Sequence, residues 1–363
     1  MKIKDLCSYA PKSRIKAGEA VENAKYLFFT SSTDENKRYT DYQFDKEAII
    51  MGTGGNATVH YYNGKFSVST DCLVLFPNSK IKCKYLYYFF KSHMSVLEAG
   101  FKGAGLKHTN KKYIEEINVS EVPDLTTQEK IVSHLNTITE NIEKLNRELE
   151  LFDLLTKARF VEMFGDYLKE DRRPLSEVAI ITGGLTKNSN RNTFETKMPY
   201  LRVANVFYNR LDLREILKIG VKEEEIEKTL LQAGDLLFVE GNGSIEQIGR
   251  VAIWDGSIDP ILHQNHLIKA RFNNEIIAPE YALFYFMLQD GRQQIISKSV
   301  STSGLNTLSV NKVSSLLLPI PPIALQKQFS VFVKLVDKSR EAVKKSLEKT
   351  QQLYDSLMQE YFG

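Results

Sequence analysis

Two short segments contain residue types that could bind a cofactor or a metal ion. Residues 52–57, GTGGNA, follow the apolar run EAIIM and have glycine spacing typical of a dinucleotide-binding loop. Such a loop needs a helix after it, whose N-terminus receives the pyrophosphate. Residues 58–62, TVHYY, and an Asn63–Gly64 pair follow instead, and they predict a strand and a hairpin turn. The sequence therefore favours no cofactor on this chain.

The second segment is His263-Gln264-Asn265-His266, which offers two imidazoles. The pair lacks HExxH spacing, neighbouring cysteines and an obvious third ligand, so we predict no metal site. There is no GxxxxGK[ST] loop for ATP, no NPPY motif of an adenine methyltransferase, and no Ser/His/Asp set. The aromatic run Tyr85, Tyr87, Tyr88, Phe89 and Phe90 could stack on bases, but the buried face of a helix explains it better. The sequence gives no positive case for catalysis.

Charge is balanced overall but uneven along the chain. The 363 residues carry a net charge of +3, with 42% hydrophobic and 26% charged residues, as in ordinary globular proteins. Eight lysines and one acidic residue lie between Ser79 and Lys112. Such a cluster neutralises phosphates or forms a solvated surface, and both interpretations stay open.

Cysteine usage and hydropathy indicate a cytoplasmic protein. Cys7, Cys72 and Cys83 are odd in number and lack CxxC pairing, which predicts reduced thiols rather than disulfides or a zinc site. The first residues, MKIKDLCSYAPKSR, have no apolar signal-peptide core. No apolar run approaches the ~18 residues that span a membrane, so we expect no membrane association.

The chain repeats one plan twice. Phe164–Gly165 and Phe362–Gly363 are offset by 198 residues, as are Gln128 and Gln326, each after a proline-bearing segment. Gly105–Leu106 and Gly304–Leu305 are offset by 199, and Tyr85 and Tyr281 by 196. Four landmarks in one order with a nearly constant offset indicate a tandem repeat.

Each copy ends in a predicted long helix with an apolar residue every three or four positions. About 36 residues make a rod of roughly 55 Å, and one apolar stripe needs a partner, for which the other copy's helix is the obvious choice. Arg340 and Thr350 occupy two positions of the second stripe and would weaken or specify the pairing. The alternative is that each stripe packs only on its own globular domain. The predicted seam is Ile131, Leu135, Ile138, Ile142, Leu145, Leu149 and Phe152 with Phe329, Val333, Val336, Val343, Leu347, Tyr354 and Leu357.

The segment before each helix predicts an α+β globular domain. Short β-rich runs such as CLVLF, DLLFVE and RVAIW alternate with glycine turns, and a helical stretch, KYLYYFFKS or EYALFYFMLQ, follows them. The globular parts align poorly with each other, whereas the helices and flanking landmarks align well. We therefore predict a domain at 1–125, a helix at 126–168, a second domain at 169–322 and a second helix at 323–363.

This organisation resembles the specificity subunits of Type I restriction–modification systems. The local matches are spread over nearly the whole chain: ARFVEMFGD, LPIPPIALQKQ, GDLLFVEGNGSIEQIGRVAIW, HQNHLIKARF, MPYLRVANV and GTGGNATVHYYNGKFSVSTDCLVLF. The resemblance implies two target recognition domains, each reading half of a split double-stranded DNA sequence. It also implies two long antiparallel coiled-coil helices in a pseudo-twofold tandem repeat. The first domain is short, at about 125 residues, which leaves its reading role less secure than that of the second.

The resemblance also implies partners and places the chemistry on them. The family binds two methyltransferase (modification) subunits, and restriction subunits complete the enzyme. S-adenosylmethionine and ATP would sit on those partners, which flip out and methylate an adenine. The chain itself would then be a non-catalytic subunit without a cofactor.

Base contacts favour Arg and Lys for guanine and Asn and Gln for adenine. Polar residues at predicted turns and strand ends are the candidates. In the first domain they are Thr53, Asn56, Lys65, Lys107, His108 and Lys112, and in the second Asn188, Asn190, Arg191, Arg202, Asn205, Gln247, Arg250, Gln264 and Asn265. For each one, a capped turn or a solvated surface group is the plainer interpretation.

Three alternative functions stay open for this chain. The chain could be a coiled-coil scaffold with two lectin-like or peptide-binding heads and no DNA readout. It could read DNA for a different enzyme, such as a fused restriction–methyltransferase system. It would be an enzyme only if His263 and His266 bound a metal ion.

Overall fold

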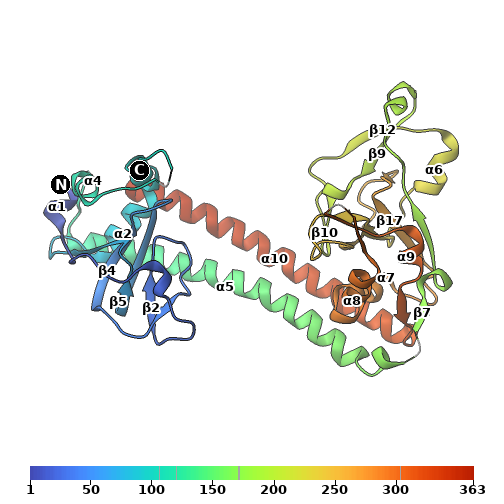
Figure 1. The fold of residues 1–363 in the computed structure, drawn as a ribbon, viewed down its shortest axis with the longest axis horizontal. Coiled ribbons are helices and arrows are strands. Elements are labelled where there is room, and N and C mark those ends of the chain that lie inside the picture. Colours follow the sequence, from blue (N-terminus) through green and yellow to red (C-terminus); the bar gives the residue numbers. More distant parts are fainter. Residues whose placement is uncertain (106, 120, 171, 303) are drawn as a thin grey trace. The chain divides into compact units, whose positions relative to one another are not determined.

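The computed structural model describes residues 1–105, 107–119, 121–170, 172–302 and 304–363. Its internal contacts divide the chain into unit 1, Met1–Arg147 with Lys344–Gly363, and unit 2, Glu148–Val343. The heptad stretches are helical as α5 (Leu125–Phe164) and α10 (Ile323–Phe362) (Figure 1). The boundary between the units therefore falls within both long helices.

Unit 1 contains a six-stranded sheet of order β1-β6-β4-β5-β2-β3, antiparallel except where β2 runs parallel to β5. Short helices precede and follow this sheet, and α2 packs on β4 and β5. The elements are α1 (Ile3–Leu6), β1 (Cys7–Tyr9), β2 (Tyr26–Phe29), β3 (Arg38–Tyr39), β4 (Phe44–Gly52), β5 (Thr58–Val68), β6 (Cys72–Pro77), α2 (Cys83–Ser92), α3 (Met94–Ala99) and α4 (Lys111–Glu116).

The hairpin turn predicted at Asn63–Gly64 is wrong. β5 continues through both residues, and they pair with Glu47 and Lys46 of β4. A two-residue type I′ turn needs positive φ at both central residues, but only Gly64 has one, at 139°. The chain instead turns over residues 53–57, between β4 and β5. A strand, and not the helix that a dinucleotide-binding loop needs, still follows the glycine run.

The aromatic run in α2 is part of the unit 1 core, as the simpler interpretation predicted. Tyr85, Tyr88, Phe89 and Phe90 are at most 4% exposed. The Tyr88 hydroxyl donates to the Asn136 side chain of α5 at 2.9 Å, which satisfies its buried polar end. These rings hold α2 between the sheet and the long helices.

Unit 2 is built from a four-stranded antiparallel sheet, β15-β13-β17-β8, with smaller sheets around it. Apolar strand residues and the helix α7 form its largest core cluster. The elements are β7 (Arg172–Pro174), β8 (Ala179–Gly183), β9 (Lys197–Leu201), β10 (Val206–Phe207), β11 (Arg210–Leu211), β12 (Leu217–Gly220), α6 (Glu223–Thr229), β13 (Leu236–Val239), β14 (Gly241–Asn242), β15 (Val251–Ile253), β16 (Leu262–His263), β17 (Leu267–Phe272), α7 (Pro279–Met287), α8 (Gln289–Lys298), β18 (Val300–Thr302), β19 (Leu305–Thr307), α9 (Val310–Ser314) and β20 (Leu317–Pro319).

Within each unit, α5 and α10 run antiparallel. In unit 1, His134 of α5 contacts the Tyr361 hydroxyl of α10 at 3.0 Å. In unit 2, Arg340 of α10 pairs with Asp153 of α5 at 2.8 Å, so this polar seam residue has a specific partner. The fourteen predicted seam residues are buried or half-buried, and none is exposed. The apolar stripes are therefore covered in both units.

The repeat-related glutamines make the same hydrogen bonds in the two units. Gln128 and Gln326 are fully buried near the starts of α5 and α10. The Gln326 side chain accepts from the Ala278 amide at 2.9 Å and donates to the carbonyls of Ile276 and Pro321 at 3.0 and 2.8 Å. Gln128 makes the corresponding three bonds, with the Lys82 amide and the carbonyls of Lys80 and Pro123. Each glutamine thus ties its long helix to the loop before a short aromatic helix, α2 or α7.

The FG ends of the long helices cross over between the repeats. Phe164, at the end of α5, lies in the core of unit 2, with its ring centroid 4.7 Å from that of Tyr281. Phe362, at the end of α10, lies in the core of unit 1, 5.1 Å from the ring of Tyr85. Each unit therefore combines one globular segment with the start of one long helix and the end of the other.

We expect Gln326→Met to destabilise unit 2 by roughly 3 kcal/mol, because it leaves one buried amide and two buried carbonyls without partners. Urea denaturation followed by circular dichroism measures the change. The matched control is Gln328→Met, an exposed site two residues along the same helix. That control should stay within about 0.5 kcal/mol of the parent. Equal losses in the two variants would contradict the role of the buried glutamine.

Candidate nucleic-acid interface

Two loops of unit 1 bring four of the six predicted residues of the first domain together. The Gly55 amide donates to the Lys107 carbonyl at 2.9 Å, and the Thr109 amide to the Thr53 carbonyl at 3.0 Å. Gly54 forms an isolated bridge with His108, and an added Cβ there would lie 3.2 Å from the imidazole. A side chain at this position would therefore require the exposed His108 imidazole to move slightly away.

Some side chains of these two loops are hydrogen-bonded within the protein, and others are exposed to solvent. The Thr53 hydroxyl donates to the Asp71 carbonyl at 2.9 Å, so it serves the loop itself. Asn56, Lys107 and His108 are exposed. Lys102, which the sequence analysis did not select, pairs with His108 through two backbone hydrogen bonds and adds a second lysine to the exposed side chains nearby. We call Thr53, Asn56, Lys102, Lys107 and His108 the unit 1 loop cluster.

Two other predicted residues of the first domain have surroundings of their own. Lys65 lies on β5, 3.8 Å from the Asp45 carboxylate and 4.6 Å from the centre of the Tyr42 ring. Its positive charge therefore has an acidic neighbour. Lys112 is exposed on α4. Neither residue makes a recorded contact with the loop cluster among the described residues.

In unit 2, Arg191 is part of the internal structure. It is 7% exposed, and its guanidinium forms two bonds with the Glu225 carboxylate at 2.8 and 3.0 Å. Another bond reaches the Gly220 carbonyl at 3.0 Å, and the ion pair lowers the pKa of Glu225. Its donors are used internally, so Arg191 is removed from the candidate base contacts. Its neighbours Asn188 and Asn190 are exposed and remain candidates.

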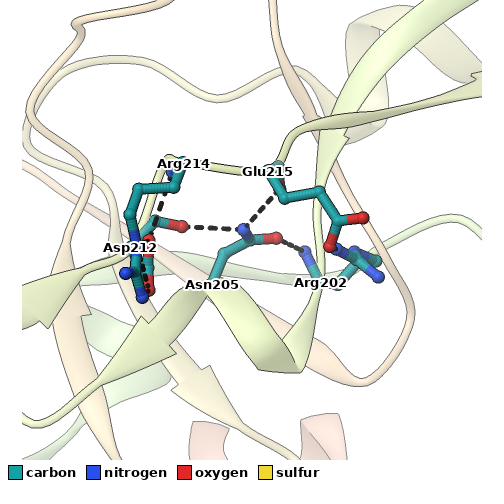
Figure 2. A network of polar contacts seen from close by, with 5 residues as sticks. All are labelled: Arg202, Asn205, Asp212, Arg214 and Glu215. Carbon is teal, nitrogen blue, oxygen red and sulfur yellow. Dashed lines mark hydrogen bonds and ion pairs between the residues drawn. The ribbon is translucent and has the colours of Figure 1, made fainter.

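Asn205 also has an internal role, as Figure 2 shows. It is 3% exposed, accepts from the Arg202 amide at 2.8 Å, and donates to the carbonyls of Asp212 and Glu215 at 2.8 and 3.0 Å. Its side-chain NH2 group holds the turn at 212–215 and its oxygen holds the Arg202 amide, so Asn205 is removed from the candidates as well. Arg202 pairs with Glu215 at 2.7 Å, while its Nε is buried without a partner.

The remaining candidates of unit 2 fall into two groups. Gln264 and Asn265 are half-buried in the segment between β16 and β17. The backbone N–H of Gln264 donates to the Leu201 carbonyl and that of Asn265 to the Leu185 carbonyl, each at 3.0 Å. Gln247 and Arg250 lie in the segment between β14 and β15. The Arg250 guanidinium carbon lies 5.3 Å from the centre of the Phe207 ring. This brings Arg250 to the β10–β11 hairpin.

The sequence analysis missed residues of that hairpin. The guanidinium carbon of Arg210, at the start of β11, lies 4.6 Å from the centre of the same Phe207 ring. Arg292 of α8 lies over the Tyr208 ring at 5.5 Å. Asn209 has φ of 48°, the positive value that a tight turn needs. The signal was the FYNR segment itself, an Asn turn flanked by aromatic residues and arginine.

The structure separates the two histidines that raised the question of a metal site. His263 is fully buried and its Nδ1 donates to the Thr229 carbonyl at 2.8 Å, whereas His266 is exposed and lies 2.7 Å from Glu240. Among the described residues, no group of three His, Cys, Asp or Glu side chains is placed to hold a metal ion. In the same part of the chain, no helix is long and apolar enough to cross a membrane.

A family model described as the Type I restriction modification DNA specificity domain matches residues 1–151 and again 170–352. The chain therefore belongs to the Type I restriction–modification DNA specificity family.

Individual relatives and solved structures agree with this assignment. The putative MjaX specificity subunit of Methanocaldococcus jannaschii is 29% identical over 57% of this chain and 48% of its own length. The EcoKI specificity subunit of Escherichia coli is 24% identical over 77% of this chain and 65% of its own length. Both matches span less than two thirds of the relative. A crystal structure of an S subunit from M. genitalium has the same fold, with a TM-score of 0.67, 18% identity, and coverage of 100% of this chain and 95% of that one.

We expect His263 to give the stability of unit 2 a pH dependence. Burial lowers the pKa of His263 to about 4, and in the unfolded chain the pKa returns to its ordinary value of about 6.5. The unfolded state therefore binds a proton before the folded state does, so stability falls as pH decreases from about 6.5 to 4, by roughly 3 kcal/mol.

Urea unfolding at a series of pH values measures this dependence. His263→Asn should remove that part of the slope, whereas His266→Asn, three residues away and exposed, should keep it. A slope unchanged by His263→Asn would contradict the assignment to this imidazole.

Proposed function

We propose that this chain is a non-catalytic DNA-specificity subunit of a Type I restriction–modification enzyme. Each globular domain reads one half of a split, asymmetric target in double-stranded DNA. The chain positions two methyltransferase subunits and the restriction subunits on that target. S-adenosylmethionine and ATP are bound by these partners, and the adenine is methylated there.

The observation that supports this proposal is that the same glutamine hydrogen bonds attach two differently built domains to the long helices. Gln128 and Gln326 make equivalent hydrogen bonds at the starts of α5 and α10. The domains anchored in this way differ, because unit 1 has one six-stranded sheet and unit 2 a four-stranded sheet with smaller ones. Two unlike readers on a common support imply two unlike half-sites. The family model, which matches once in each half, supports the same conclusion.

The candidate readers also differ in their chemistry. Unit 1 offers the loop cluster with Asn56, Lys107 and His108 exposed. Unit 2 offers Asn188 and Asn190 at the start of the 3-10 helix Ser189–Thr193, Gln264 and Asn265 between β16 and β17, and Arg250 beside Phe207. Asparagine and glutamine suit adenine, while arginine and lysine suit guanine or phosphate. These side chains supply the donors and acceptors that base reading needs.

The two long helices support a spacing role. We propose that α5 and α10 form one antiparallel coiled coil that sets the unread spacer between the half-sites, and that the domains are 1–125 and 169–322 with helices at 126–168 and 323–363. A 40-residue helix is about 60 Å long, more than one DNA turn of ~34 Å. Such a rod is long enough to keep two readers on separate turns of the duplex.

Methylation mapping by single-molecule sequencing tests the specificity role. In a host that expresses this chain with its methyltransferase, we expect methyladenine in both halves of one split, asymmetric motif. The methylation should disappear when this chain is deleted. Unchanged methylation, with the methyltransferase present and active, would overturn the proposal and favour a protein-interaction scaffold. As an internal control, replacing residues 170–322 by the equivalent segment of a relative should change one half-site and keep the other.

Shortening both helices by one heptad tests the spacing role. Asp153 pairs with Arg340 within unit 2, and Ile142 lines the same groove as Leu347 within unit 1. In the proposed single coiled coil, residues 143–149 would therefore face residues 344–350. Deleting both segments keeps the seam in register and removes about 10 Å of helix. The mapped motif should keep both half-sites and lose about three base pairs of spacer. An unchanged spacer would contradict the proposal that the helices set it.

A further inference from the structure

Arg250 is a half-buried cation without an acidic partner among the described residues. Its guanidinium lies 3.4 Å from the Val203 carbonyl and 3.5 Å from the Gln247 side-chain oxygen, both long for hydrogen bonds. Its Nε is buried, and no described residue offers it a hydrogen-bond partner. A charge removed from water in this way is costly unless a counter-charge arrives. The lowered pKa that burial gives Arg250 has the same physical cause.

Arg210 contacts the same aromatic ring as Arg250, that of Phe207. Both guanidinium carbons are over the Phe207 ring, at 4.6 and 5.3 Å from its centre, so they are no further apart than those two distances together. Arg210 is exposed, and in the described part of the chain no hydrogen bond or ion pair engages its guanidinium. Two cations that form no ion pair among the described residues thus lie over one aromatic ring. The charge of Arg210 also acts on the Asp212 carboxylate, which is bonded to Arg214.

The other arginines of this region are already engaged. Arg214 is paired with Asp212 at 2.6 Å, and this bond lowers the pKa of the Asp212 carboxyl to about 2. Arg202 is paired with Glu215 at 2.7 Å. Arg292 donates to the carbonyls of Ile245, Glu246 and Ile248. Arg292 keeps its positive charge, but these carbonyls use its nitrogen donors. Among the described arginines of this region, the guanidinium donors left for a ligand are therefore those of Arg210 and Arg250.

The support beneath this pair is fixed before any ligand arrives. The Tyr208 hydroxyl donates to the Glu246 carbonyl at 2.6 Å, which ties the β10–β11 hairpin to the segment before β15. Arg292 holds the same segment through three carbonyls. Phe207 and Arg250 consequently keep their relative positions, and only the exposed Arg210 has to adjust.

We infer that Arg210 and Arg250, held over Phe207, form a clamp for one phosphate of the DNA backbone. The inference rests on the proposed function and adds to it a contact that is independent of base sequence. A phosphate oxygen would replace the long contacts of Arg250 and bring a counter-charge to both guanidinium groups. Unit 2 would be positioned on the duplex through this clamp, while its other polar residues read bases.

Base reading by Arg250 fits the geometry less well. A guanine-reading arginine extends its terminal nitrogens to the O6 and N7 atoms on the groove floor. Arg250 has its Nε buried and its stem packed beside Phe207, so its guanidinium stays close to the protein surface. The backbone phosphates lie at the outer edge of the groove, where a guanidinium held close to the protein surface can contact them.

The test uses the full chain bound to its methyltransferase subunits and two duplexes, one with the mapped motif and one without it. Affinity is measured at several salt concentrations for Arg210→Gln, Arg250→Gln, the double variant, and Arg250→Lys. The matched control is Arg214→Gln, an exposed arginine of the same region whose charge is already neutralised. Thermal unfolding of each variant checks the fold, and the exposed Arg210 keeps the test decisive if Arg250→Gln is unstable.

We expect each single Gln variant to lose roughly fivefold to tenfold in affinity near 0.1 M salt, equally for both duplexes. The double variant should lower the salt slope by about one, the value for one neutralised phosphate. Arg250→Lys should recover most of the loss, Arg214→Gln should stay within about twofold, and the methylated motif should not change.

Three results would overturn the clamp while leaving the proposed function intact. These are unchanged affinity in both Gln variants, a loss confined to the motif duplex together with an altered motif, and a loss in Arg214→Gln as large as in Arg210→Gln. By contrast, a parent protein that does not distinguish the two duplexes would refute the proposed function itself.

Discussion

The structure depends on one buried interaction made twice, the glutamine that ties each long helix to its globular domain. Gln128 and Gln326 carry no charge, yet each buried side chain satisfies three backbone groups. An amide is suited to this task because one side chain both accepts and donates. With this junction fixed, the sheets beyond it are free to differ in strand number and order. A support that is the same in both units and sheets that differ between them therefore follow from the same local chemistry.

The second constraint is the crossing of the helix ends. Phe164 and Phe362 belong to one repeat by sequence but to the core of the other by packing. The aromatic contacts with Tyr281 and Tyr85 are equivalent in the two units. Neither sequence repeat is thus a complete folding unit, and the compact units are assembled from both. Three of the four repeat landmarks, namely the FG ends, the two glutamines, and Tyr85 with Tyr281, lie at these junctions, whereas Leu106 of the fourth lies outside the described residues.

Sequence analysis predicted the elements that depend on long-range periodicity and missed features that depend on tertiary contacts. The heptads of α5 and α10 and the buried face of α2 could be recognised because apolar spacing is a local signal. The Asn63–Gly64 turn was wrong, since pairing with β4 carries β5 straight through it. Arg191 and Asn205 were chosen for residue type, but Glu225 and the turn at 212–215 occupy them. Arg210 became visible only when β10, β11 and Arg250 met around Phe207.

The crossing of the helix ends also has a consequence for synthesis on the ribosome. Met358 and Phe362 are part of the core of unit 1, although they are translated only after the whole of unit 2. The first domain must therefore emerge with an aromatic face of α2 still uncovered. It has to remain soluble while the second domain is made. Chaperone binding or aggregation would act on the nascent chain during this interval. The interval ends when the last turns of α10 pack against unit 1.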